Sequence, residues 1–493
     1  MLFNSIQFIF FFVIVTALYF SVPYRYRWFL LLTVSCYFYM AFVPVYILIL
    51  FGTIVIDYFA GIIIENAQGK KRKIFLVISL ISNIGVLAVF KYYNFLNENL
   101  TVLLGGFKME NPIPMLSILL PIGLSFHTFQ AMSYTIEVYR GNQRAEKHFG
   151  IYALYVMFYP QLVAGPIERP QNLLHQFREK HSFDYKRVTE GLKLMAWGMF
   201  KKVVIADRLS VMVDRVYDHP QNYEGIPLIL ATLFFAFQIY CDFSGYSDIA
   251  IGSAQVMGFK LMKNFNRPYL SKNIAEFWSR WHISLSTWFK DYLYIPLGGN
   301  RVVKWRMYYN LLLVFLVSGL WHGAKWTFIA WGALHGIYLV SGMMTKNIRE
   351  KINTATGLHR FLFISKFIQA SITFALVCFA WIFFRASTIT DAMYVVNHLF
   401  TGLTKNFQSI LSNVDQQRAE ILYLGQDINI FFLTFVLIGI LLCVHFWQRG
   451  KNMREFISQK PNWYRWSLYF TCLLFIIYLG VFTSKQQFIY FQF

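Results

Sequence analysis

Apolar residues fall in long runs along the chain, and polar residues gather in the short stretches between them. A helix needs about 20 apolar residues to cross a bilayer, and most runs approach that length. We therefore expect an all-α integral membrane protein with about 11 to 13 transmembrane and re-entrant helices. We expect residues 1–493 to form a single membrane domain. No internal repeat is visible, which weighs against inverted-repeat transporters. The runs lie near residues 2–20, 28–42, 45–64, 74–90, 113–135, 149–164, 190–206, 226–242, 308–320, 325–343, 362–384, 429–446 and 465–482.

The composition agrees with this class. The chain is 57% hydrophobic and only 14% charged, whereas soluble domains carry about 25% charged residues. Its net charge of +21 comes from basic loops such as Lys70–Lys73. Loops of this kind favour contact with membrane lipids and acidic partners, and they argue against nucleic acid. The five cysteines have no CxxC spacing, so we expect neither a disulfide framework nor a metal site.

The basic loops also predict how the chain crosses the membrane. Loops around Arg25, Lys70–Lys73 and Arg140–Lys147 should be cytoplasmic, which places the N-terminus outside. Counting back from the other end, the basic segment 449–465 should be cytoplasmic and the tail 484–493 extracytoplasmic. Between residues 165 and 260 the alternation is unclear, and the number of crossings there stays open. The first run lacks a basic n-region and a cleavage site, so we expect it to be retained.

The stretch Ser318–Ala324 places a titratable imidazole, His322, between two apolar runs. The run 308–320 would rise roughly 20 Å as a helix, less than the roughly 30 Å hydrocarbon core. We therefore expect Trp321–Ala324 to turn inside the membrane, with His322 at the floor of an outward-facing pocket. Ionisable groups at this depth usually face a cavity or a path. The alternative is a packed histidine that is bonded to a neighbouring helix.

Between residues 260 and 307 basic side chains alternate with Trp and Tyr, a mixture typical of interfacial or re-entrant helices. Pro296, Gly298 and Gly299 then interrupt the chain. We take 260–324 as the re-entrant, chemistry-bearing segment. The sequence has no GxSxG, HExxH, Walker A or dinucleotide-binding motif, which weakens the case for a hydrolase, a zinc protease or an ATP-driven pump.

Two tryptophan-flanked histidines stand about forty residues apart in this segment, within Phe277-Trp278-Ser279-Arg280-Trp281-His282 and Ser318-Gly319-Leu320-Trp321-His322-Gly323. With these motifs the sequence resembles the membrane-bound O-acyltransferase (MBOAT) family, in the bacterial branch that contains the alginate O-acetylation membrane protein. The resemblance implies helices around a central funnel and acyl transfer from a thioester to a hydroxyl. It extends to residues 165–170, 240–248 and 291–301.

The resemblance implies that His322 is the catalytic base and that His282 is a second catalytic histidine. An imidazole suits the first role because its ordinary pKa near 6.5 lets it accept a hydroxyl proton at neutral pH. Asp242 and Asp248 flank a Ser-Gly-Tyr sequence that we expect to form a turn. His127, His335 and His445 lie on apolar runs and are expected to be core residues. Candidates for lining the donor site or tunnel are Trp321, Gly323, Arg280, Trp281, Lys290, Asp291 and Asp242.

The chain ends in an aromatic hexapeptide, Phe488-Ile489-Tyr490-Phe491-Gln492-Phe493. One interpretation is an aromatic anchor at the outer interface. The other, implied by the resemblance, is that the tail enters the outer pocket and that Tyr490 relays the acyl group. A phenol is more acidic than an alcohol, so a nearby base activates it more easily.

The resemblance therefore implies an O-acetyltransferase of the bacterial inner membrane that serves O-acetylation of an extracytoplasmic polysaccharide, alginate or a similar glycan. The donor would be a cytoplasmic thioester, either acetyl-CoA or an acyl carrier protein, and we expect no bound cofactor. By resemblance, an extracytoplasmic SGNH or esterase-fold acetyltransferase would be the partner. The alternatives are a D-alanyl transferase for teichoic acids and, more distantly, a proton-coupled transporter.

Overall fold

The computed structural model describes residues 1–117, 121, 123–162, 165–411, 420–448, 450, 453–482 and 488–489, and the structural statements below concern these residues. Their regular structure is entirely helical, without a strand in the described ranges. Among them, six helical segments are long and apolar enough to cross a membrane, which confirms the predicted all-α membrane class. These segments are Pro44–Asn66, Gly69–Gly106, Ile226–Met257, Trp326–Met344, Leu362–Arg385 and Ile428–Trp447.

The chain divides into two compact units, one formed by residues 1–195 and 246–263 and the other by residues 196–245 and 264–493. That residues 1–493 act as one domain stays a prediction. The helices of the first unit are α1 (Ile6–Ser21), α2 (Arg27–Met40), α3 (Ile47–Asn66), α4 (Gly69–Leu87), α5 (Tyr93–Gly106), α6 (Leu124–Arg140), α7 (Phe149–Met157), α8 (Tyr159–Leu162), α9 (Pro170–Leu173) and most of α10 (Tyr185–Met199).

The second unit carries the segments in which the chemistry was predicted. Its helices are α11 (Asp207–Tyr217), the first part of α12 (Ile226–Met257), α13 (Ile274–Trp278), α14 (Ile283–Phe289), α15 (Lys304–His322), α16 (Trp326–Met344), α17 (Lys346–Ala355), α18 (Leu362–Arg385), α19 (Ile389–His398), α20 (Leu403–Leu411), α22 (Ile428–Trp447), α23 (Met453–Ser458) and α24 (Asn462–Leu479). Two π-helical segments, η5 (Phe200–Ala206) and η8 (Lys290–Tyr294), interrupt this pattern.

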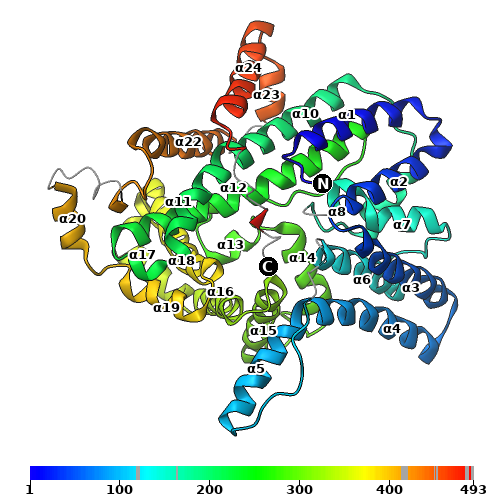
Figure 1. Ribbon diagram of the computed structural model, residues 1–493, viewed down its shortest axis with the longest axis horizontal. Coiled ribbons are helices and arrows are strands. Elements are labelled where there is room, and N and C mark those ends of the chain that lie inside the picture. The colour runs from blue at the N-terminus through cyan, green and yellow to red at the C-terminus, as the bar shows by residue number, and fades with distance from the viewer. Residues whose placement is uncertain are drawn as a thin grey trace. The chain divides into compact units, whose positions relative to one another are not determined.

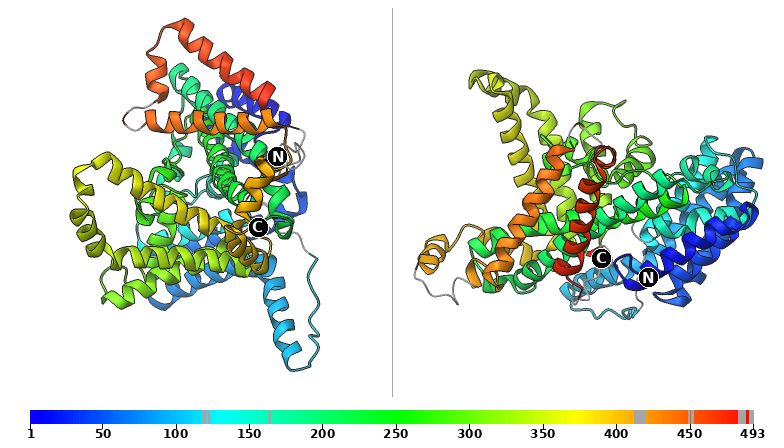
Figure 2. Two further views of the ribbon diagram at one scale, coloured as in Figure 1. Left: turned by 90° about the vertical axis from the view of Figure 1, so that its left-hand side faces the viewer. Right: turned by 90° about the horizontal axis from the view of Figure 1, so that it is seen from above.

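In the first unit, α3, α4 and α6 pack side by side (Figure 1). In the described part of the expected run 113–135, the helix α6 begins at Leu124. Pro112, Pro114 and Pro121 have no backbone N–H to donate, and Gly123 adopts a left-handed conformation. The residues before it run back along α5 instead, and Asn94 and Asn97 bond their carbonyls. Figure 2 (left) shows α5 and this return segment together.

Helix α12 is the longest helix in the described chain, and its 32 residues rise about 48 Å. It passes without a break through Ser244-Gly245-Tyr246, so the turn expected between Asp242 and Asp248 is wrong. Gly245 has a packing role here: a Cβ at this position would lie 2.7 Å from the Gly198 carbonyl oxygen. Because Gly245 has no side chain, the backbone at Gly198 can approach α12 closely.

Helices α15 and α16 form an antiparallel hairpin (Figures 1 and 2). Glycines allow the two backbones to touch: a Cβ on Gly319 would lie 2.2 Å from the Phe328 oxygen, and one on Gly332 would lie 2.3 Å from the Phe315 oxygen. The turn expected at Trp321–Ala324 lies later, because Trp321 and His322 complete the last turn of α15. The non-helical residues are 323–325, and Gly323 is extended with φ −164°.

Candidate active site

His322 is the last residue of α15 and is 4% exposed. Its ring lies edge-on to Trp331 of α16, with 4.9 Å between centroids, and 5.4 Å from Phe384 of α18. Three helices therefore hold the imidazole in an aromatic environment of low polarity. The expected pocket above this ring stays a prediction.

His282 is the N-cap residue directly before α14 and is fully buried. Its φ of 42° lies in the left-handed region, which costs a non-glycine residue roughly 1–2 kcal/mol. Neighbouring bonds hold this conformation, since Asn264 accepts the Ile283 N–H at its carbonyl and the Ser284 hydroxyl at its side chain (2.6 Å). Burial lowers the pKa of the His282 imidazole to about 3, so the ring is neutral at physiological pH. Strain maintained at a buried histidine is typical of functional sites.

The Trp321 indole connects the two histidines. Its centroid lies 4.9 Å from that of His322 and 6.4 Å from that of His282. The start of α14 and the end of α15 thus place the two predicted catalytic histidines around a common indole. Their catalytic roles stay predictions.

Residues 488 and 489, near the C-terminus, also lie in this region. Phe488 and Ile489 are 1% and 4% exposed, and the Ile489 N–H donates to Oδ2 of Asp242 at 2.8 Å. The Phe488 ring lies 5.6 Å from that of Phe243, and Phe243 lies 4.6 Å from the His282 ring. Tyr490, the predicted relay, lies outside the described residues.

Asp242 belongs to a buried ionic cluster that the sequence reasoning missed in part. Lys202 of η5 pairs with Asp242 at 2.6 Å and with Asp207 at 2.7 Å, and each of the three side chains is at most 5% exposed. A signal was present in the sequence, because Lys202 and Asp207 lie at the end of the apolar run 190–206 and charges at such positions are rare. Asp248 lies further along α12 and is only half-buried.

The remaining predicted residues divide between the core and the surface. Trp281 is buried, and its ring lies 5.1 Å from both Phe265 and Trp381. Gly323 is buried as well, and a Cβ there would clash with the Phe328 ring. Lys290 is exposed and Asp291 half-buried, both in η8.

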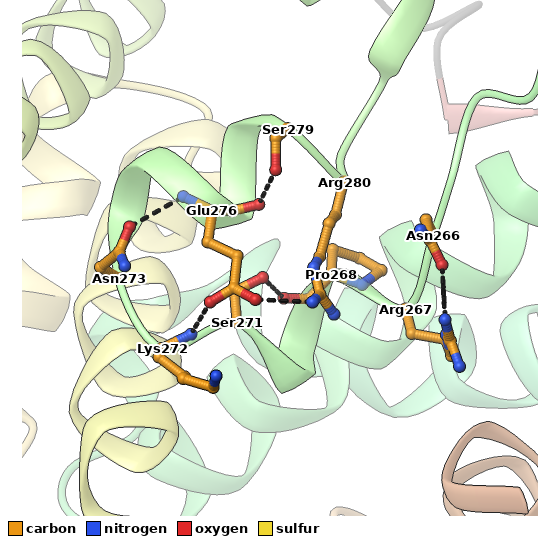
Figure 3. A network of polar contacts seen from close by, with 9 residues as sticks. All are labelled: Asn266, Arg267, Pro268, Ser271, Lys272, Asn273, Glu276, Ser279 and Arg280. Carbon is orange, nitrogen blue, oxygen red and sulfur yellow. Dashed lines mark hydrogen bonds and ion pairs between the residues drawn. The ribbon is translucent and has the colours of Figure 1, made fainter. Parts of the chain in front are cut away.

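Arg280 lies in a polar network that joins residues 266–280 (Figure 3). It forms an ion pair of 2.5 Å with Glu276, one helical turn earlier. Glu276 also accepts the Lys272 N–H, at 2.7 Å. The Arg280 charge is thus compensated within its own segment, and its predicted role in donor binding stays a prediction.

Three further histidines are buried and hydrogen-bonded, as expected of core residues. His127 bonds Thr53 at 2.9 Å, His445 bonds the Tyr240 hydroxyl at 3.1 Å, and His335 accepts the Trp278 indole N–H at 3.2 Å. His335 also lies near the predicted site, because its ring is 5.0 Å from Trp331, the indole that contacts His322.

Comparison with known proteins places these features in a family. Residues 143–385, which include both tryptophan-flanked histidines, match the family described as MBOAT, membrane-bound O-acyltransferase. The chain is 40% identical to the probable alginate O-acetylase AlgI of Pseudomonas aeruginosa over 81% of this chain and 75% of that protein. It is 34% identical to the peptidoglycan O-acetyltransferase of Helicobacter pylori over 94% of this chain and 91% of that protein.

A more limited similarity, 31% identity over 45% of this chain and 57% of the relative, links it to the teichoic acid D-alanyltransferase of Streptococcus thermophilus. The extent of the first two similarities and the six apolar helices lead to the same assignment. The chain belongs to the membrane-bound O-acyltransferase family and is a multi-pass membrane acyltransferase.

Proposed function

We propose that this acyltransferase moves an acetyl group from a cytoplasmic thioester across the bacterial inner membrane, for O-acetylation of an extracytoplasmic polysaccharide. The observation that carries the proposal is the grouping of His282, Trp321 and His322 where the start of α14 lies beside the end of α15. The two relatives that match most of this chain are named as an alginate O-acetylase and a peptidoglycan O-acetyltransferase, which supports acetyl transfer over D-alanyl transfer.

In the proposed reaction His322 acts as the general base. As the acceptor oxygen attacks the thioester carbonyl, the imidazole takes the hydroxyl proton. The carbon–sulfur bond then breaks, and the imidazolium returns the proton to the leaving thiolate, so that an ester and a thiol are formed. A base placed in this way contributes about 10²–10⁴-fold to the rate. His282, held neutral by burial, supplies a hydrogen-bonding nitrogen beside the same indole.

The first acceptor in this scheme is the phenol of Tyr490. Its oxygen forms a phenyl ester and releases the thiol, and a hydroxyl of the glycan or of a partner enzyme then takes the acetyl group and restores the phenol. The second step is favourable because a phenolate is a better leaving group than an alkoxide. The partner we propose is an extracytoplasmic SGNH or esterase-fold acetyltransferase, and the donor is acetyl-CoA or an acyl carrier protein.

The proposal is tested by supplying membrane vesicles with a radiolabelled acetyl thioester on the cytoplasmic side and measuring label esterified on the outer side. His322→Gln should lower transfer by at least about 10²-fold. His335→Gln is a matched control, because both imidazoles contact Trp331, at 4.9 and 5.0 Å. Equal transfer by His322→Gln and wild type would refute the assignment of the base. Solute uptake without any acyl transfer would instead favour a transporter.

A D-alanyl transferase would be recognised in the same vesicles. Label from a D-alanyl thioester would then be transferred and acetyl label would not. Tyr490→Phe tests the relay separately, because the ring is kept and only the hydroxyl is lost. Transfer that continues in this variant would remove the covalent intermediate but leave the role of His322 standing.

A further inference from the structure

We propose that Asp242 and Lys202 form a docking clamp for the C-terminal segment and position its start beside the histidine pair. This inference rests on the proposed function for its purpose, because the docked segment leads into the predicted relay residue. The clamp residues are positioning residues, since they hold the backbone of the segment.

The two oxygens of Asp242 serve different partners. Oδ1 pairs with the Lys202 ammonium at 2.6 Å, and Oδ2 accepts the Ile489 N–H at 2.8 Å. A buried carboxylate is stable only when it is paired and hydrogen-bonded. The lysine fixes the orientation of the carboxylate, and the second oxygen is thereby directed at the incoming backbone.

Lys202 is itself held from the other side. Asp207 pairs with it at 2.7 Å and is as deeply buried as Asp242. The ionic cluster thus contains two carboxylates around one ammonium, and within the described residues it is Asp242, not Asp207, that bonds Ile489. This asymmetry separates a docking role from a purely structural role of the ion pairs.

Further contacts guide the same segment along η5 and the start of α11. The Val481 N–H donates to the Val203 carbonyl at 2.9 Å, and Arg208 donates to the Leu479 carbonyl at 2.6 Å. Ile489 joins the apolar core of the second unit. The chain that leaves α24 is therefore bound near its beginning, by η5, and again at Ile489, by Asp242.

The docked position has a direct relation to the site. Phe488 packs on Phe243, and Phe243 packs on His282. Tyr490 is the next residue along the chain after Ile489. Since a misplacement of about 1 Å in a reacting group can lower a rate about 10²-fold, a fixed attachment one residue from the relay is effective positioning.

Docking can be measured without enzyme activity. In the full chain, Ile489→Cys keeps the backbone N–H and introduces a thiol at a buried position. Its alkylation rate, followed on the peptide by mass spectrometry, reports release of the segment apart from the five native cysteines. Adding Asp242→Asn should raise this rate about 10-fold or more, because a charge-assisted bond and its ion pair are lost.

Asp207→Asn is the matched control, because it removes the other partner of Lys202 and spares the contact with Ile489. In that variant, alkylation of the thiol introduced by Ile489→Cys should stay within about twofold of the parent rate. If both substitutions expose the thiol equally, or if neither does, the docking clamp is refuted and the cluster is structural.

A kinetic test uses the backbone donor itself. Ile489→Pro removes the N–H that Asp242 accepts, whereas Ile489→Ala keeps it. The proline variant should have a kcat at least about 10-fold below that of the alanine variant at an unchanged KM for the thioester. Equal kcat values would overturn the positioning role. Because alkylation reports docking even if His322→Gln retains transfer, failure of the clamp and failure of the proposed function are distinguishable.

Discussion

Replacing Gly319 by alanine tests whether the contact between α15 and α16 determines the position of His322. A Cβ at this position would lie 2.2 Å from the Phe328 carbonyl oxygen, a backbone atom that cannot rotate away. Side-chain Cβ atoms stay at least about 3.0 Å from such oxygens, so the helices must separate by about 0.8 Å. His322 lies one turn further along α15 and would move with the helix.

The expected effects on activity and on stability differ in size. A displacement of this order in a catalytic group lowers the rate about 10²-fold. Overpacking costs about 1–3 kcal/mol of folding free energy, and the better helix propensity of alanine returns about 1 kcal/mol. We therefore expect acetyl transfer by Gly319→Ala to fall about 10²-fold, while the melting temperature in detergent falls only slightly.

Gly342→Ala is the control, because this glycine lies in α16 and its Cβ would meet nothing within 4 Å. This variant should keep wild-type transfer and gain up to about 1 kcal/mol from propensity alone. The assay is outward acetyl labelling of vesicles beside thermal unfolding of the same preparations. Wild-type transfer by Gly319→Ala would refute the argument that the helix contact positions the imidazole.

Three further predictions concern other parts of the molecule. Burial raises the pKa of Glu168 to about 7 from its ordinary 4.5, so between these pH values unfolding releases a proton. As the pH rises from 4.5 to 7, the wild type should therefore lose about 1.4 kcal/mol of stability per pH unit relative to Glu168→Gln. An equal dependence of melting temperature on pH in the two proteins would contradict this. His282 has a positive φ, a conformation that asparagine tolerates better than a β-branched residue. In thermal unfolding, His282→Val should therefore be less stable than His282→Asn by about 1 kcal/mol. Equal melting temperatures of the two variants would argue against backbone strain at this position. If Arg280 binds the donor, Arg280→Gln should raise the KM for the donor and leave kcat unchanged. The folding free energy should change by no more than about 1 kcal/mol, because the ion pair with Glu276 is partly exposed. An unchanged KM would show that Arg280 is not part of the donor site.

The sequence was sufficient to predict helices and the motif-bearing residues, because both are local patterns. The apolar run 325–343 corresponds to α16 within one residue at each end, and the run 362–384 corresponds equally closely to α18. Helix breaks were harder to predict where apolar residues continue through them. The run 113–135 contains Pro114 and Pro121, and α6 begins only after them, at Leu124, although the hydrophobic pattern starts earlier.

The tertiary part of the site could not be predicted, for a physical reason. Asp242 and Ile489 are 247 positions apart, and the identity of a carboxylate says nothing about which distant N–H it will accept. The same holds for Lys202, whose position in an apolar run indicated that it must be paired but not with which residues. The error at Ser244-Gly245-Tyr246 has the same origin, since glycine is typical of turns and also of closely packed helices.

In the second unit, the buried charged side chains and the buried histidines occupy separate environments. The rings of His282 and His322 lie among aromatic side chains, and burial lowers the pKa of His282 so that its imidazole is neutral. Asp207 and Asp242 both pair with Lys202, and Phe243 separates Asp242 from His282 along the contacts described. An unpaired carboxylate next to either imidazole would stabilise the imidazolium and so favour the form that cannot accept a proton. Confining the carboxylates to a lysine-centred cluster therefore lets Asp242 bond the Ile489 N–H without placing a carboxylate against the His282 ring.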